Sequence, residues 1–414
     1  MVPNGWEKGT LNDIASTVMG YAFKSEDFIE NGIPLLRMGN LYQNSLDLNR
    51  NPVYLPEYFE GEYERFLVKP GDLVMSMTGT IGKRDYGFTV EIPQGTKYLL
   101  LNQRVLKIVP KKSVSGYILN LLRSELILST LYSFPGGTKQ ANLSAKQVQE
   151  LPVLIPPLPE QKKIAQILSA WDSAISVTEK LLTNSQQQKK ALMQQLLTGK
   201  KRLLDESGVR FSGEWKKVKL GDVFEKVCNG LTYDASSLEG LPVTRIETIS
   251  TGSVNFDKVG WAPDCDSTRR FKLEFGDILY SHINSLEHIG RVAYYNDEKP
   301  LYHGMNLLLL RTKRQSNSLF LFYLLNSQIG KKYAKTYAKS AVNQASISTA
   351  DIKTFQVFIP EREEQQKIAT VLSAADAEIS TLEKKLTCLK DEKKALMQQL
   401  LTGKRRVTVD AEAA

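Results

Sequence analysis

Two stretches of the chain carry apolar residues at alternating steps of four and three. The stripes run over 164–196 and 368–400, and apolar side chains fill seven of the ten positions in the first and nine of ten in the second. A 3.5-residue period is typical of a coiled-coil seam. Prolines precede both runs, and Thr-Gly follows both at 198–199 and 402–403, which are usual helix start and stop signals. The pattern predicts two helices of about 39 residues, each roughly 58 Å long.

Helices of this length need a partner, and the simplest partner for each is the other. Because a long segment separates them, the chain can double back, and we expect an antiparallel pair. The alternative is that each helix buries its stripe in its own domain. The residues expected to pack the helices or a partner are Ile164, Leu168, Trp171, Ile175, Leu182, Leu192 and Leu196 in the first, and Ile368, Leu372, Ile379, Leu382, Leu386, Leu389, Leu396 and Leu400 in the second.

The dodecamer KKALMQQLLTGK occurs at 189–200 and returns at 393–404, which is 204 residues later. At the same offset, PPLPEQKKIAQILSAWDSAIS (156–176) aligns without a gap with PEREEQQKIATVLSAADAEIS (360–380). The repeat extends to residues expected to face solvent, namely Lys190, Gln194 and Gln195, which recur as Lys394, Gln398 and Gln399. A repeated outer face indicates that one partner surface is presented twice, although recent duplication would also leave such identity.

The segments that precede the two helices are related but far more divergent. GIPLLRMGNL (32–41) corresponds to GLPVTRIETI (240–249), and GTKQANLSAKQVQELPVLIPP (137–157) corresponds to AVNQASISTADIKTFQVFIP (341–360). Gly-Asp turns also recur, at 71–72 and 276–277. Short β-branched and aromatic runs broken by Gly, Pro and Asn predict strands, and helical patches are expected at 117–131 and 319–338.

The fold class is therefore α/β (α+β): two similar globular modules and two long antiparallel coiled-coil helices, related by an internal pseudo-two-fold repeat. Similar scaffolds with different surface residues suit two modules that bind two different ligands. The predicted parts are the first module at 1–157, the first helix segment at 158–202, the second module at 203–359, the second helix segment at 360–404 and a tail at 405–414.

Composition narrows the class of protein without identifying a ligand. Charged residues make up 24% of the chain and the formal net charge is +9, which permits nucleic-acid binding, yet no segment has a concentrated basic face. The longest apolar runs, such as 319–325, are too short to cross a membrane, and the first residues do not resemble a signal peptide. Three scattered cysteines without a CxxC pair fit a reducing compartment. We expect a cytoplasmic protein.

A search for catalytic residues finds no convincing site. NPVY (51–54) resembles the NPPY loop of adenine methyltransferases, but Val53 replaces the second proline and no glycine-rich cofactor motif precedes it. TGTIGKR (78–84) lacks the first glycine and the final Ser or Thr of a P-loop. The three histidines all lie in the second module at a spacing that fits no metal site. We expect no catalysis, no metal and no cofactor in this chain.

The order of the parts resembles the specificity subunit of Type I restriction–modification systems, over roughly residues 4–404. The resemblance is carried by LPVLIPPLPEQKKIAQIL (151–168), FQVFIPEREEQQKIATVL (355–372), the two ALMQQLLTGK ends and the paired Gly-Asp turns. It implies that each module is a target recognition domain for one half of a split, double-stranded DNA sequence. The helices would space the half-sites and dock two modification (methyltransferase) subunits. Those partners would bring S-adenosylmethionine and methylate an adenine in each half-site, and motor-nuclease restriction subunits would join the full complex.

Base and phosphate contacts require Arg, Lys, Asn and Gln side chains on exposed loops. The candidates for DNA binding are Arg37, Lys83, Arg84, Arg104, Lys139, Gln140 and Asn142 in the first module, and Arg245, Arg291, Lys331, Lys335, Lys339, Asn343 and Gln344 in the second. The three lysines have helical i, i+4 spacing. Two other functions remain open: an autonomous DNA methyltransferase or nuclease, and an interaction scaffold that never binds DNA.

Overall fold

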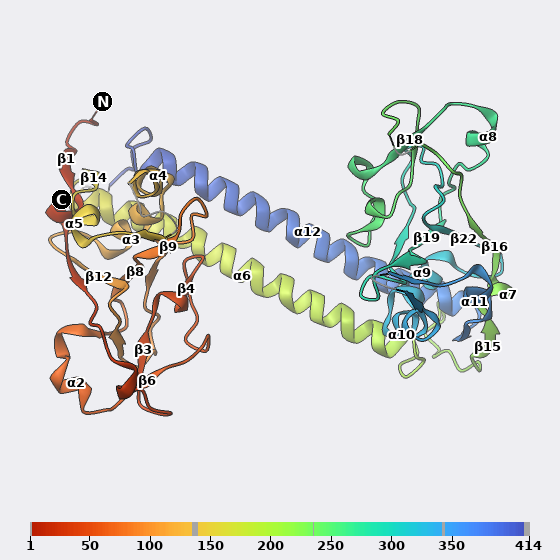
Figure 1. Cartoon of the computed structure of the whole chain (residues 1–414), viewed down its shortest axis with the longest axis horizontal. Helices are drawn as coiled ribbons and strands as arrows, with labels where there is room; N and C mark the ends of the chain where they lie inside the picture. Colours follow the sequence, from red (N-terminus) through yellow and green to blue (C-terminus); the bar gives the residue numbers. More distant parts are fainter. Residues whose placement is uncertain (1, 135–139, 235, 342–343, 410–414) are drawn as a thin grey trace. The chain divides into compact units, whose positions relative to one another are not determined.

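The computed structural model describes residues 2–134, 140–234, 236–341 and 344–409 (Figure 1). The chain divides into two compact units, Met1–Glu179 with Lys384–Ala414 (unit 1) and Lys180–Glu383 (unit 2). Both division points fall inside long helices, α6 (Leu158–Leu196) and α12 (Arg362–Leu400), each of 39 residues. Each unit therefore holds one module together with part of both helices, and the helices begin beside the predicted boundaries at 157/158 and 359/360.

Unit 1 contains two four-stranded sheets, with strand orders β10-β8-β12-β2 and β6-β3-β11-β7. Three pairs, β1–β14, β9–β13 and β4–β5, lie outside them. The strands are β1 (Glu7–Thr10), β2 (Ala15–Met19), β3 (Ile33–Leu36), β4 (Leu41–Tyr42), β5 (Ser45–Leu46), β6 (Tyr54–Leu55), β7 (Leu67–Val68), β8 (Leu73–Ser76), β9 (Thr78–Thr80), β10 (Thr89–Glu91), β11 (Leu99–Leu101), β12 (Val105–Pro110), β13 (Gln140–Asn142) and β14 (Pro152–Ile155). The shorter helices are α1 (Leu11–Ile14), α2 (Phe59–Glu62), α3 (Ser115–Arg123), α4 (Glu125–Ser133) and α5 (Ala145–Gln149).

Unit 2 repeats the central part of this arrangement, with the sheet β16-β22-β19-β21 and the smaller sheets β15-β25, β17-β18 and β20-β24-β23. The strands are β15 (Lys216–Lys219), β16 (Phe224–Asn229), β17 (Leu241–Val243), β18 (Gly260–Ala262), β19 (Ile278–Tyr280), β20 (Ile283–Asn284), β21 (Val292–Tyr294), β22 (Leu308–Thr312), β23 (Lys339–Ala341), β24 (Gln344–Ser346) and β25 (Gln356–Ile359). The shorter helices are α7 (Leu220–Val223), α8 (Asp266–Arg269), α9 (Ser318–Asn326), α10 (Gln328–Tyr337) and α11 (Thr349–Thr354).

Both predicted helical patches are confirmed, and each consists of two helices. The first patch is α3 and α4, and the second is α9 and α10. Ser124 and Ser327 stand at the two breaks, in extended backbone, and each side chain accepts a hydrogen bond from the first turn of the following helix. A serine at this position caps a new helix start more readily than it continues the old one, which explains both breaks.

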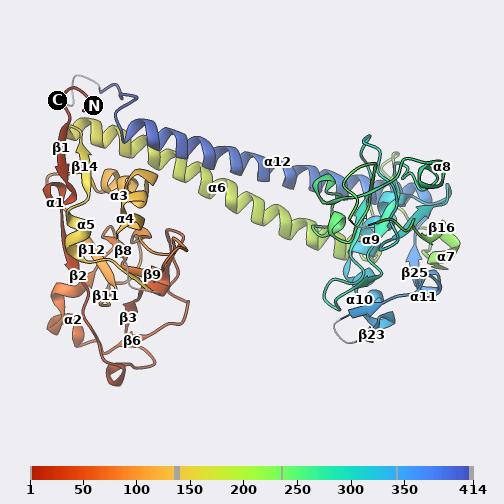
Figure 2. The same ribbon diagram turned by 45° about the horizontal axis from the view of Figure 1, so that its top comes forward.

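In both units α6 and α12 lie side by side and run antiparallel (Figures 1 and 2). In unit 1, Asp172 pairs with Lys393 at 2.6 Å and Glu179 pairs with Lys390 at 2.7 Å. In unit 2, Lys189 pairs with Asp376, and Ser185 donates to Glu378 at 3.0 Å. Numbers rise along one helix as they fall along the other, so the helices are antiparallel in each unit.

The seam residues predicted from the period are all buried or half-buried among the described residues. Leu196 and Leu197 belong to the core of unit 2, whereas Leu400 and Leu401 belong to the core of unit 1. The two copies of the dodecamer therefore end in different modules. The end of α6 packs into the second module, and the end of α12 packs into the first. Burial in a core explains why these leucines are identical in both copies of the dodecamer. No helix of the described residues is both long and apolar enough to span a membrane.

Candidate nucleic-acid interface

The DNA-binding candidates of the first module that the structure describes gather around the strand pair β9–β13. Gln140 is paired with Thr80 and Asn142 with Thr78 in this antiparallel ladder. Both Gln140 and Asn142 are exposed, whereas Ala141 between them is buried. The period of two in a strand points the polar side chains outward and the alanine inward. Lys83 and Arg84 lie in the exposed turn that follows β9.

Arg37 and Arg104 lie close to the same strand pair. The Thr78 hydroxyl donates to the sulfur of Met38, which places the residue after Arg37 against β9. The Met77 N–H donates to the Arg104 carbonyl at 3.0 Å, so Arg104 adjoins the start of β9. The structure therefore brings candidates from four distant stretches of the first module to one edge, namely the surroundings of the strand pair β9–β13.

Arg84 is already engaged within the module. Its guanidinium pairs with Glu125 at 3.0 Å and lies 5.2 Å from the centre of the Tyr132 ring. Both charged side chains are more than half exposed, so the pair contributes little stability and leaves Arg84 available to a ligand.

In the second module, the equivalent place is the sheet β20-β24-β23. Gln344 on β24 is exposed and Ala345 beside it is buried, as in the first module. Arg245 lies at a turn and forms a weak ion pair with Glu247 at 3.4 Å. Arg291 is held differently, because its guanidinium donates to the carbonyl of Ser250 and contacts His288 Nδ1 at 3.2 Å.

The predicted lysine stripe is not one helical face. Lys331 and Lys335 are exposed on α10, but this helix ends at Tyr337 and Ala338 is extended. Lys339 is in strand β23, where it lies 3.7 Å from Asp351. The i, i+4 spacing therefore fails at its third member. Lys331 and Lys335 line a cavity of about 1570 Å³ in unit 2. The candidates Lys139 and Asn343 lie outside the described residues.

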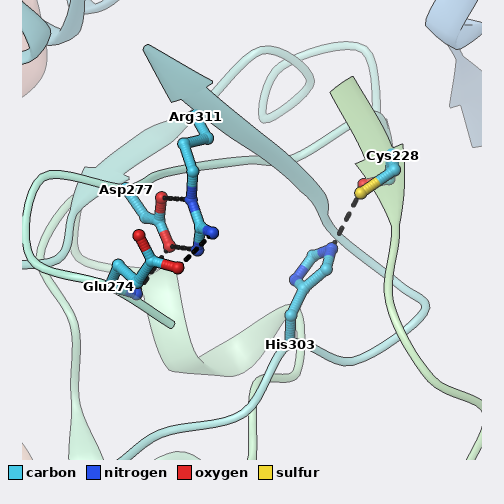
Figure 3. Close-up of polar contacts among 5 residues, drawn as sticks. All are labelled: Cys228, Glu274, Asp277, His303 and Arg311. Atoms are coloured by element: carbon cyan, nitrogen blue, oxygen red, sulfur yellow. Dashed lines mark hydrogen bonds and ion pairs between the residues drawn. The ribbon is translucent and has the colours of Figure 1, made fainter. Parts of the chain in front are cut away.

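The paired Gly-Asp turns have an internal role. Asp277 accepts the Glu274 N–H at 2.7 Å and two bonds from Arg311 on β22, at 2.8 and 2.6 Å (Figure 3). These bonds raise the pKa of Arg311 above its usual value. The counterpart Asp72 accepts the Lys69 N–H at 2.7 Å and pairs with Lys107 at 2.6 Å.

Two histidines of the second module are buried. Burial lowers the pKa of both His282 and His303 to about 4, so both are uncharged at neutral pH. The Nε2 atom of His303 lies 3.2 Å from the carbonyl of Cys228 (Figure 3). No group of three or more His, Cys, Asp or Glu side chains among the described residues has the geometry to hold a metal ion.

Sequence reasoning missed the ion pairs that close each unit. Arg406 donates to Glu160 at 3.0 and 2.5 Å in unit 1, and Arg202 donates to Glu364 at 2.6 and 2.7 Å in unit 2. Each arginine follows the end of one helix and each glutamate stands at the start of the other. The signal was present, because both residue types recur at the 204 offset, but their pairing required the antiparallel arrangement.

The repeated glutamine after each glutamate fixes the helix start to its module. Gln161 accepts the Val114 N–H at 3.0 Å and donates to Pro156 at 2.9 Å. Gln365 accepts the Asn317 N–H at 2.9 Å and donates to Pro360 at 2.8 Å. The Glu-Gln pair of each helix is therefore structural.

Comparisons with known proteins agree on one family. The model of the Type I restriction modification DNA specificity domain matches residues 3–184 and 212–390. The chain is 43% identical over 195 residues to a putative type I restriction enzyme MjaX specificity subunit of Methanocaldococcus jannaschii, and this match covers 46% of each chain, less than half of that relative. It is 25% identical to the EcoKI specificity subunit of Escherichia coli, over 93% of this chain and 85% of that one.

Solved structures share the fold. The S subunit of the Type I restriction–modification system from M. genitalium matches with a TM-score of 0.62 at 14% identity, covering 97% of both chains. A chain from a structural study of type I complex assembly matches with a TM-score of 0.58 at 18% identity, covering 98% of this chain and 100% of that one. With two matched domains over most of its length, the chain belongs to the family of Type I restriction–modification DNA specificity subunits.

Proposed function

We propose that this chain is the non-catalytic DNA-recognition subunit of a Type I restriction–modification complex, and that each module binds one half of a bipartite double-stranded target. The observation that carries the proposal is the repeated strand pair with different exposed side chains. Asn142 on β13 corresponds to Ser346 on β24, and both are exposed beside a buried alanine. A common scaffold with different hydrogen-bonding groups suits the reading of two different base sequences.

The helices would fix the separation of the half-sites. A 39-residue helix is about 58 Å long, whereas one turn of B-DNA advances about 34–36 Å. A helix pair of this length would allow two readers to bind more than one turn apart along a duplex. The interhelical ion pairs Asp172–Lys393 and Lys189–Asp376 occupy equivalent places in the repeat and support a defined register.

The outer faces of the helices would dock two modification subunits. Lys190 and Gln194 on α6, and their counterparts Lys394 and Gln398 on α12, are all exposed. Burial explains the identity of the leucines in the dodecamer, but it does not explain the identity of these exposed residues. An identical surface presented twice suits two copies of one partner.

The partners would supply the chemistry. The two modification subunits would bind S-adenosylmethionine and methylate an adenine in each half-site, and motor-nuclease subunits would join for restriction. The chain itself would hold no cofactor. The complex would work in the cytoplasm, because its DNA substrate lies in that compartment.

Mapping methylated adenines across the host genome tests this function. Deleting the gene should abolish methylation at one bipartite motif, and restoring the gene should bring it back. Exchanging the second module for that of a relative should change one half of the motif and leave the other half intact. Unchanged methylation after deletion of the gene, in a host with an active modification subunit, would contradict the proposal.

The two other functions give different results. An autonomous methyltransferase would transfer the label from S-adenosylmethionine to DNA when the purified chain is the only protein present. A scaffold that does not bind DNA would show no sequence preference even when modification subunits are added.

A further inference from the structure

The internal repeat provides a test of what each identical residue does. The modules have diverged, so a residue that remains identical in both needs a reason. For several such residues the reason is internal. Asp72 and Asp277 each cap a turn and pair with a cation, and Glu160 and Glu364 each bind an arginine. Identical residues that the fold does not use therefore indicate an external ligand.

Gln140 and Gln344 are such a pair. They begin the matching sequences QANLS (140–144) and QASIS (344–348). The other identical members are explained, because Ala141 and Ala345 are buried and both serines cap helices. The glutamines are exposed strand residues, and an exposed strand position does not require glutamine.

Arg37 and Arg245 are the second pair. In both modules the turn uses the arginine's backbone, because its N–H donates to a side chain three residues later. That acceptor differs, being Asn40 at 2.9 Å in the first module and Thr248 at 2.8 Å in the second. Any residue except proline could supply the N–H, so the turn explains neither guanidinium. The ion pair of Arg245 with Glu247 at 3.4 Å is more than a third exposed on both sides and contributes little stability.

In the first module, the arginine and the glutamine lie near the same strand pair, and the pairing of Arg245 with Gln344 in the second module is inferred from the repeat. Met38, next to Arg37, accepts a hydrogen bond from Thr78 on β9, and β9 pairs with the strand that carries Gln140. Both side chains are donors for phosphate and sugar oxygens, and a guanidinium adds a charge-assisted bond to phosphate.

Resting on the function proposed above, we propose that Arg37 with Gln140, and Arg245 with Gln344, form one contact set repeated in both modules that binds the sugar–phosphate backbone. Identical side chains do not account for the difference between two half-sites, whereas the backbone is the same in both. Discrimination belongs to neighbouring positions that differ. Asn142 is replaced by Ser346, and Arg104 by Asn306.

The equivalence of Arg104 and Asn306 follows from the backbone. The preceding residues, Gln103 and Met305, donate their N–H groups to Tyr21 and Leu231, which occupy corresponding positions after β2 and β16. Arg104 is exposed and has no arginine counterpart, so it is the matched control for Arg37.

The experiment compares R37A, R245A, Q140A and Q344A with R104A, each in the full chain bound to its modification subunits. Affinity for the target duplex and for a random duplex is measured between 50 and 200 mM salt, and the methylated motif is mapped in cells. R37A and R245A should each weaken binding to both duplexes by the same factor, about tenfold, and reduce the salt slope by about one. Q140A and Q344A should weaken both duplexes equally but less, without changing the salt slope. The methylated motif should stay unchanged in all four variants.

R104A should instead lower the ratio of target to random affinity and relax one position in a single half-site. Relaxed discrimination in R37A or Q140A would show base reading and overturn the proposal, as would unchanged affinity for both duplexes. Thermal unfolding and assembly with the modification subunits confirm that each variant is folded. A wild-type complex that does not prefer the target duplex would instead refute the proposed function itself.

Discussion

The starts of the two long helices are held by the same ion pair in two different surroundings. In unit 1, Glu160 accepts bonds from Arg406 and also from the indole N–H of Trp6, at 3.1 Å. In unit 2, Glu364 binds Arg202, and the indole nitrogen of Trp215 is buried without a hydrogen-bond partner among the described residues. Each arginine lies about 6 Å or less from its tryptophan ring, at 5.8 Å for Arg406 and 6.0 Å for Arg202.

Because the two surroundings have diverged, the glutamate in unit 2 depends on fewer hydrogen-bond donors than the glutamate in unit 1. The Glu364 side chain is 1% exposed and depends on Arg202, whereas Glu160 is 10% exposed and has the Trp6 donor as well. Arg202 is itself less exposed than Arg406, at 20% against 41%. An unpaired buried carboxylate costs more than a partly solvated one, so equivalent substitutions should not have equal effects.

Replacing Arg202 with alanine should have the largest effect. It strands the buried Glu364 carboxylate and should lower the free energy of unfolding of unit 2 by about 3–4 kcal/mol. The same change at Arg406 should lower that of unit 1 by about 1–2 kcal/mol, because Arg406 is more exposed and Trp6 still donates to Glu160. Hydrogen exchange resolved by peptide measures each unit separately. Lys201→Ala is the exposed control, and equal losses in the two units would contradict the comparison.

Placing a charge in the seam between the two long helices should have the next largest effect on stability. Leu192 packs on the core of unit 2 and Leu396 packs on the core of unit 1, both half-buried. Leu192→Glu and Leu396→Glu should each lower the free energy of unfolding of their own unit by about 2–3 kcal/mol and weaken assembly with modification subunits. Gln194→Glu is the matched change on the exposed face of α6. If assembly and DNA binding survived both leucine substitutions, the spacer role of the helices would be wrong.

Lowering the pH should destabilise unit 2 more than unit 1, because all three histidines of the chain lie in unit 2. The folded pKa of His282 is lowered by burial to about 4, below the unfolded value of about 6.5. The unfolded state therefore binds protons first, and stability is full above about pH 6.5 and falls between about pH 6.5 and 4. At pH 5 this histidine should cost unit 2 about 2 kcal/mol.

The repeat offers a matched substitution for this test. His282 occupies the place of Met77, because each carbonyl accepts an N–H from the residue before its helix cap, Ile347 or Leu143. His282→Met should reduce the loss of stability of unit 2 between pH 7.5 and 5 by about 2 kcal/mol. Equilibrium unfolding followed by hydrogen exchange at several pH values measures it, and an unaltered pH profile would refute the assignment.

The smallest expected effect concerns one hydrogen bond that, among the described residues, has no counterpart in unit 1. Asp376 accepts from Lys189 and from the Tyr323 hydroxyl, at 2.7 Å, whereas Asn120 stands in the place of Tyr323 in unit 1 and donates to Gly116. Tyr323→Phe should lower the free energy of unfolding of unit 2 by about 1 kcal/mol. A chemical denaturation series against Tyr42→Phe, an exposed control, checks the value, and a loss above about 3 kcal/mol would indicate a packing defect instead.

Much of the fold could be predicted because its strongest signals are local and periodic. The 3.5-residue stripe fixed the length and packing face of α6 and α12, and the offset of 204 revealed the repeat. The lysine stripe failed for the opposite reason. Spacing alone could not show that α10 ends at Tyr337 and that Lys339 joins a strand. The helical patches at 117–131 and 319–338 are confirmed, but the pattern did not predict the break inside each, where a serine cap competes with helix continuation.

The candidate DNA residues remain predictions, and the structure adds their neighbourhood. Arg37, Arg104 and Asn142 come from separate stretches of sequence, and only strand pairing brings them to one edge. The same pairing shows that Gln140 is exposed and Ala141 is buried, which the amino-acid sequence alone does not show.

By itself, the sequence determined the repeat, the two helices, their seam and the family resemblance, because periodicity and identity are properties of the chain. Only the tertiary structure decided that Glu160 meets Arg406 and that Glu364 meets Arg202. It also decided that the end of each helix enters the core of a module. The physical reason is that buried charges and core leucines are stabilised by groups far away in sequence, and those groups are defined by the antiparallel packing of the helices.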